Sequence, residues 1–222
     1  MDFSGNDGAA MENRLAQAEK AYHKWAPYLT SSNISLRRRL ALLVRTVFAS
    51  ALWLSETWQV TKQQREHFES WGARVAARVC VLHRSPLDDI GQYWRRLHRT
   101  GHKLLRSIGG GLDLRRATRL HSFAGHVARS SQDLVSAALR TRCLAWWRFR
   151  QVRYHSKFDG LHPKRFKTWR WESQITAHYG EAEAENGYTN VGWMQLAQSR
   201  EGWKASLQAF LLNVVGYQAA PV

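Results

Sequence analysis

Apolar residues recur at helical spacing along most of this 222-residue chain, and this periodicity limits the folds open to it. The clearest stripe follows three- and four-residue steps through Leu36, Leu40, Leu43, Val44, Val47, Phe48 and Ala51. Such spacing places apolar side chains on the face of a helix that packs against a core. Because no stretch shows convincing strand alternation, the sequence predicts an all-α assembly of about seven or eight helices with no substantial sheet.

Start and stop signals divide this pattern into individual helices. The first should end before Pro27, since a proline disfavours helical backbone in the residue before it. Thr61 and Gln64 read as a capping box, Asp88 or Asp89 can cap the next helix, and three glycines at 109–111 end it. The predicted helices are 10–25, 36–53, 61–82, 90–108, 114–128, 132–150, 191–198 and 201–214.

Four segments differ in composition. We expect a disordered N-terminal remnant at 1–11, a helical domain at 12–84, a basic helical region at 85–180, and a linker with the last helices at 181–222. Within the basic region, the helix after Asp89 has a predicted apolar face with Ile90, Trp94, Leu97, Gly101, Leu104 and Ile108. Its opposite face carries Arg95, Arg96, Arg99, Lys103 and Arg106.

The positive charge of the chain is concentrated in one block. Residues 91–170 hold 15 Arg and 4 Lys against three Asp, which equals the net charge of +16 of the whole chain. One interpretation is a solvated basic face. A single-sign block of this length repels itself without a counter-charged partner, so binding to a polyanion, nucleic acid first, is favoured over a small-metabolite enzyme.

Two further features suggest phosphate contacts. Arg37, Arg38 and Arg39 crowd the first turn of a helix, where positive charge opposes the helix dipole. Basic and aromatic residues also alternate at 145–154, as single-stranded nucleic acid requires. The alternative for that stretch is a core aromatic face with arginines extending beside it.

Signals for catalysis, metal binding and export are missing from the sequence. His98 and His102 share a helix face, but no Glu lies between them and no Cys-x-x-Cys completes a site. Cys80 and Cys143 form no spaced pair, the N-terminus is polar, and the apolar run at 40–54 is too short to span a membrane. We therefore expect no catalytic residue, metal or cofactor, and an intracellular location in cytoplasm or nucleus.

Several short segments, in order, resemble the reverse transcriptases of non-LTR (LINE-type) retrotransposons. Residues 52–62, Leu-Trp-Leu-Ser-Glu-Thr-Trp followed by Thr-Lys, are similar to the family's YGSETW-x-LT segment. Residues 123–129 resemble its RWxGHVxRM box, 164–175 its GRPxxRWxDxI box, and 193–203 its closing W-x-x-LAQDRxxW segment. The chain departs from the family at Leu54, where the family has glycine, and at Ser122–Ala124.

The resemblance implies that residues 12–84 are a polymerase thumb and that the following basic helices hold template RNA, with the catalytic palm in another part of a longer polyprotein. The expected partner is RNA or an RNA–DNA duplex, with neither a membrane nor a small-molecule substrate. Alternatives are a decayed retroelement relic without activity and a basic RNA-binding scaffold. From charge and helix faces, the candidate contacts are Arg37, Arg38, Arg39, Arg45, Arg95, Arg96, Arg99, Lys103, Arg115, Arg116, Arg119, Arg148, Arg150, Lys164, Arg165, Lys167 and Arg170.

Overall fold

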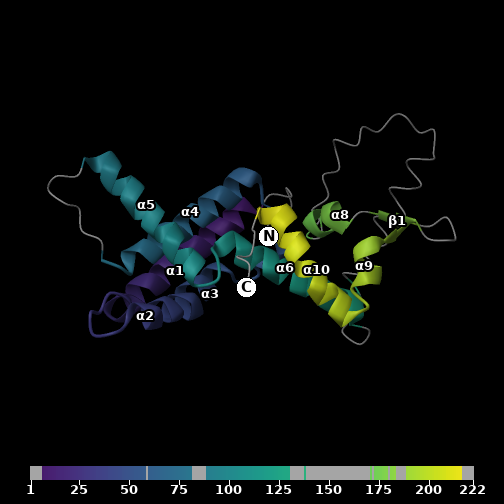
Figure 1. Cartoon of the computed structure of the whole chain (residues 1–222), viewed down its shortest axis with the longest axis horizontal. Coiled ribbons are helices and arrows are strands. Elements are labelled where there is room, and N and C mark those ends of the chain that lie inside the picture. The colour runs from purple at the N-terminus through teal and green to yellow at the C-terminus, as the bar shows by residue number, and fades with distance from the viewer. Residues whose placement is uncertain are drawn as a thin grey trace. The chain divides into compact units, whose positions relative to one another are not determined.

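A computed structural model of the chain describes residues 7–58, 60–81, 89–130, 138, 171, 173–179, 181–183 and 189–216. These residues are overwhelmingly helical, which confirms the all-α fold class (Figure 1). The chain divides into two compact units, residues 1–116 and 117–222, with the division inside helix α6 (Leu112–Arg129). The predicted helix at 132–150 lies outside the described residues, apart from residue 138. No helix among the described residues is both long enough and apolar enough to cross a membrane.

The first unit is built from helices packed around one apolar core. In chain order they are α1 (Gly8–Leu29), α2 (Leu36–Leu43), the π-helical turn η1 (Val44–Phe48), α3 (Ala49–Ala51), the 3-10 turn η2 (Ser55–Thr57), α4 (Lys62–Arg78) and α5 (Ile90–Ser107). The predicted stripe is confirmed from Leu40 to Ala51, because Leu40, Leu43, Val47, Phe48 and Ala51 are all buried in this core. Leu36, at the start of α2, is exposed.

Helix α1 begins earlier and ends later than predicted. It starts at Gly8, and Met11 is buried in the core, so the predicted disorder is wrong for residues 8–11. It also runs through Pro27 to Leu29. Proline is tolerated here because only the last turn lies beyond it, and both the backbone N–H and the hydroxyl of Thr30 donate to the Ala26 carbonyl to end the helix.

The predicted helix caps around α4 and α5 are confirmed. The Gln64 N–H donates to Thr61 Oγ1 (3.2 Å), and the Thr61 N–H donates to Gln64 Oε1 (2.8 Å), which is a complete capping box. Asp89 occupies the cap position of α5. At the other end, Gly109 and Gly110 have φ of +85° and +105°, values that glycine adopts at no steric cost, so the glycine run ends α5 as predicted.

Helices α4 and α5 pack closely against each other in the first unit (Figure 1). A Cβ atom on Gly101 would lie 2.1 Å from the backbone oxygen of Ala73 in α4, so the two backbones approach as only glycine permits. Leu97 and Leu105 are buried on the same face of α5. This close approach fixes which face of α5 remains available to solvent.

The second unit contains shorter elements around an aromatic core. Beyond the second half of α6 it comprises α8 (Ser173–Tyr179), β1 (Glu181–Glu183), β2 (Thr189–Val191), α9 (Gly192–Leu196) and α10 (Arg200–Val215). The predictions missed α8 and the antiparallel pairing of β1 with β2, in which residue 181 faces residue 191. The two strands are three residues each, so no substantial sheet forms among the described residues.

Candidate nucleic-acid interface

Helix α5 separates apolar and basic side chains onto opposite faces. Its 18 residues include four Arg and one Lys and no acidic residue. Leu97, Gly101 and Leu105 are buried toward α4, whereas Arg95, Arg99, Lys103 and Arg106 are exposed to solvent. Arg96 is half-buried at the border between the two faces. The helix therefore carries a row of cations along about 16 Å, at the 1.5 Å rise of an α-helix.

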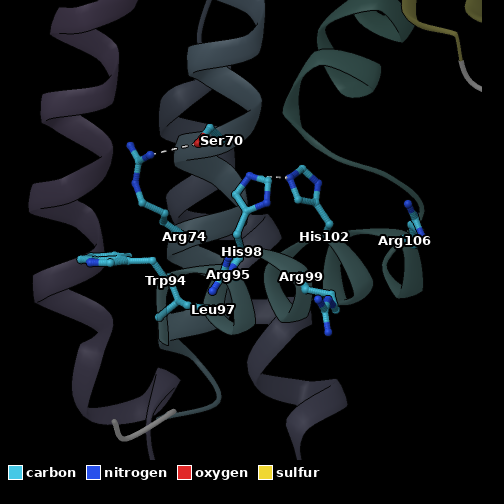
Figure 2. A pocket seen from close by; sticks show the side chains of 9 residues that line it. All are labelled: Ser70, Arg74, Trp94, Arg95, Leu97, His98, Arg99, His102 and Arg106. Carbon is cyan, nitrogen blue, oxygen red and sulfur yellow. Dashed lines mark hydrogen bonds between the residues drawn. The ribbon is translucent and has the colours of Figure 1, made fainter. Parts of the chain in front are cut away.

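This basic face forms one side of an open groove of about 660 Å³ (Figure 2). Helix α4 contributes Ser70 and Arg74 to the groove, and α5 contributes the other lining residues. They are Trp94, Arg95, Leu97, His98, Arg99, His102 and Arg106. None of these nine residues is acidic, so the described lining offers cations, one hydroxyl and an aromatic ring to a ligand.

Arg74 enters the groove from α4 and was not among the predicted contacts. Its Nη1 donates to Ser70 Oγ one turn earlier in the helix (3.0 Å), which orients the half-buried guanidinium. Acidic and basic residues are mixed along α4, so nothing in the sequence near Arg74 marks it as a candidate contact. Only the packing of α5 onto α4 joins it to the basic row.

His98 and His102 point toward each other in the groove (Figure 2). Their Nε2 atoms are 3.1 Å apart, so one ring nitrogen donates a hydrogen bond to the other. Burial lowers the pKa of His102, and the nearby His98 and Arg106 lower it further. The lowered pKa favours the uncharged form of His102. No group of three potential metal ligands occurs among the described residues.

Trp94 differs from its predicted position on the buried face of α5. Its side chain is 52% exposed, and Ile90, one turn earlier, is 54% exposed. Both residues precede the close approach at Gly101 by seven residues or more, about 10 Å along the helix, where crossing helices have diverged. The prediction that Ile90 and Trp94 face the core is therefore wrong, and Trp94 instead lines the groove.

The predicted cluster at the start of α2 separates into two kinds of arginine. Arg37, Arg38 and Arg45 are exposed, as a binding role requires. Arg39 is half-buried, and its Nη1 donates to the carbonyl oxygens of Val79 (2.6 Å) and Leu29 (3.4 Å). These carbonyls lie at the ends of α4 and α1, where a cation satisfies orphaned acceptors. The hydrogen bonds of Arg39 to these carbonyls explain its position at the start of α2 without a bound phosphate.

Arg115 and Arg116 are also used inside the first unit. Arg115 donates from Nη2 to the Ile108 carbonyl and from Nε to the Gly110 carbonyl (3.3 Å). Arg116 is 1% exposed, and its Nε and Nη2 are each 2.9 Å from Asp113 Oδ1. The prediction that Arg116 contacts nucleic acid is therefore wrong, because a buried ion pair leaves no guanidinium surface for a ligand.

Of the remaining predicted contacts, only Arg119 lies among the described residues. Arg119 is exposed on α6, in the second unit. Six others lie outside the described residues, namely Arg148, Arg150, Lys164, Arg165, Lys167 and Arg170.

A polar network lies at the centre of the second unit. The buried ring of His121 stacks on Trp203, with centroids 4.0 Å apart, and its Nε2 is 2.9 Å from the Tyr179 hydroxyl. That hydroxyl is 2.7 Å from Ser206 Oγ, and Ser206 Oγ in turn donates to the Trp203 carbonyl (2.8 Å). Burial lowers the pKa of His121 to about 4, with a smaller contribution from His178. A neutral imidazole that is enclosed by rings and satisfied by hydroxyl groups is a core element.

Segments that carry the family resemblance meet in this aromatic core. A Cβ atom on Gly125 would lie 2.4 Å from Trp203 Nε1, so the glycine makes room for the indole. Arg129 Nη1 donates to the Ala197 carbonyl (2.6 Å), and Gln198 Nε2 donates to the Ala128 carbonyl (3.1 Å). The side chains of these two segments are therefore explained by packing, and they identify no activity by themselves.

Comparison of the chain with protein-family models, with curated protein sequences and with solved structures gives no match.

Proposed function

We propose that this chain is a non-catalytic nucleic-acid-binding module that holds RNA or an RNA–DNA duplex through the basic face of α5. The proposal is supported by the resemblance to LINE-type reverse transcriptases and by the charge of the chain. The observation that carries it is the groove of the first unit, which Arg74, Arg95, Arg99 and Arg106 line without an acidic side chain among the described lining residues.

The arrangement suits phosphates better than a small anionic metabolite. Arg95, Arg99, Lys103 and Arg106 follow one another at three to four residues, about 4.5 to 6 Å along the helix axis, a spacing that engages successive charges of a backbone. A small metabolite would instead need a few convergent polar groups in an enclosed pocket. Because contacts between cations and phosphates carry no base information, the binding should tolerate many sequences and weaken with salt.

The proposal is tested by titrating the full chain with an RNA–DNA duplex across a salt series. The double variant Arg95→Ala/Arg99→Ala should bind about tenfold or more weakly at 0.1 M salt, and the slope of log K against log salt should fall by about 1.4 to 1.8. The matched control is Lys20→Ala/Lys24→Ala, which removes the same charge at the same spacing from the exposed surface of α1. The control should keep the slope of the unaltered chain.

Equal losses in the two double variants would mean that net charge alone attracts the nucleic acid, and would contradict a binding role for the α5 face. Nucleotide incorporation by the isolated chain would contradict the non-catalytic part of the proposal.

A further inference from the structure

Among described residues whose side-chain exposure is known, two tryptophans are largely exposed, Trp53 at 58% and Trp94 at 52%. Trp58, Trp71, Trp171, Trp193 and Trp203 are all buried. Exposing a large indole forfeits apolar burial that the fold could otherwise use. Trp94 is also the aromatic side chain that lines the basic groove, so its position calls for an explanation in terms of a ligand.

Trp94 lies next to another aromatic ring and lines the same groove as several arginines. The rings of Tyr93 and Trp94 meet edge to face, with centroids 5.6 Å apart. Arg95 follows it on α5, and Arg74 reaches the same groove from α4 (Figure 2). An oriented ring beside guanidinium groups provides the two interactions that single-stranded nucleic acids use, base stacking and phosphate neutralisation.

We propose that the α4–α5 groove binds single-stranded nucleic acid, with a base stacked on Trp94 and the adjoining phosphates held by Arg74, Arg95 and Arg99. This inference rests on the proposed function and narrows it. In a duplex each base is already stacked and paired, so a ring on the protein surface can stack only on a base that is free of its complement. The groove has a volume of about 660 Å³ and is open to solvent, so a strand can reach it from the surface.

The test measures dissociation constants of the full chain and its variants for oligonucleotides of one length, 15 residues. The probes are oligo(U), oligo(dT), an abasic strand that keeps the phosphates, and a 15-base-pair RNA duplex. Trp94→Ala should weaken binding of the single strands about 5- to 100-fold, the range that one lost stacking contact gives. It should change binding of the abasic strand and the duplex less than about twofold. Trp94→Phe should recover much of the loss.

Trp53→Ala is the matched control, because Trp53 has a similar exposure in the same unit and does not line the groove. It should leave all four dissociation constants unchanged. Circular dichroism of each variant confirms that the helical content is retained. Comparison of oligo(U) with oligo(dT) reports whether the groove prefers RNA or DNA.

The outcomes separate this inference from the function on which it rests. If Trp94→Ala binds every probe as the unaltered chain does, while Arg95→Ala/Arg99→Ala loses affinity for all of them, the stacking site is wrong and the phosphate-binding face stands. If Trp94→Ala weakens the abasic strand as much as oligo(U), the indole is not a stacking platform. If the arginine double variant binds like Lys20→Ala/Lys24→Ala, the proposed function itself fails.

Discussion

The two units of this chain bury polar side chains by opposite means. In the first unit, Asp113 and Arg116 form a buried ion pair at 2.9 Å, and Arg65 lies 3.6 Å from the other carboxylate oxygen of Asp113. In the second unit, the central polar group is the uncharged ring of His121, which stacks on Trp203 and meets the Tyr179 hydroxyl. The first unit thus buries a charged pair beside its apolar core, whereas the second buries an uncharged ring that hydrogen-bonds to a hydroxyl group.

This difference shows how little net charge alone says about binding. The first unit places some arginines on its solvent face, such as Arg95 and Arg99, and others inside, such as Arg116. A buried charge is tolerated only with its partner, because removing one member leaves the other desolvated and uncompensated. A network around a neutral histidine is instead destabilised when the pH falls far enough to protonate the imidazole. Loss of one charged partner should therefore destabilise the first unit, whereas a lowered pH should destabilise the second.

The largest expected effect is a loss of stability when the buried ion pair of the first unit is broken. Arg116→Ala removes the partner of Asp113 and should lower the free energy of unfolding by about 3 to 5 kcal/mol, measured by urea denaturation of the full chain. Arg38→Ala, at an exposed position of α2 in the same unit, is the control and should change it by less than about 0.5 kcal/mol. Similar costs at the two positions would show that the buried pair is not a special feature of the first unit.

The next effect is a pH-dependent loss of stability that originates at His121 in the second unit. Because the pKa of His121 is lowered to about 4 in the folded chain, the unfolded chain binds more protons between pH 6.5 and 4. The free energy of unfolding should therefore fall as the pH is lowered through this window, by up to about 3 kcal/mol.

His121→Phe keeps a ring against Trp203 and removes the titration. The difference in stability between this variant and the unaltered chain should shrink as the pH falls from 7 to 5, measured by denaturation at each pH. A difference that stays constant over that range would contradict a buried neutral imidazole in the second unit.

A smaller effect should report how tightly the aromatic interior is packed. Gly125→Ala would place a methyl group 2.4 Å from Trp203 Nε1, and we expect it to cost about 1 to 3 kcal/mol by overpacking. Gly202→Ala is the control, because its Cβ atom would lie 3.3 Å from the nearest atom, Ser199 Oγ, a contact that is tight but much less severe than that at Gly125. Thermal denaturation should show a lowered midpoint for the first variant and little change for the second.

The smallest expected effect is a gain in stability from a substitution in the first unit. Leu54 has φ of +58°, a left-handed conformation that glycine adopts freely. Because the side chain is half-exposed, Leu54→Gly should raise the free energy of unfolding by about 1 kcal/mol through relief of strain. Leu36→Gly, in helical backbone of the same unit, should instead lower it. Destabilisation by Leu54→Gly would show that the packing of Leu54 outweighs its strain.

Features that depend on neighbours along the chain could be predicted from the sequence. The capping box of Thr61 and Gln64 and the glycine stop at 109–110 follow from contacts within a few residues, and both were correctly predicted. The apolar stripe from Leu40 to Ala51 was correct for the same reason, since helical periodicity is a local property. The early start of α1 was missed because Met11 is ordered by a core that forms from distant residues.

The sequence by itself thus determined the all-α class, most helices and the basic character of the α5 face. The tertiary structure alone decided which cations remain available, because that depends on partners far along the chain. Arg39 is engaged by Val79, 40 residues away, while Arg74 is brought to the α5 row by the close approach of Gly101 to Ala73. Trp94 was left exposed because α5 diverges from α4 before that crossing, a geometry that no helical pattern records.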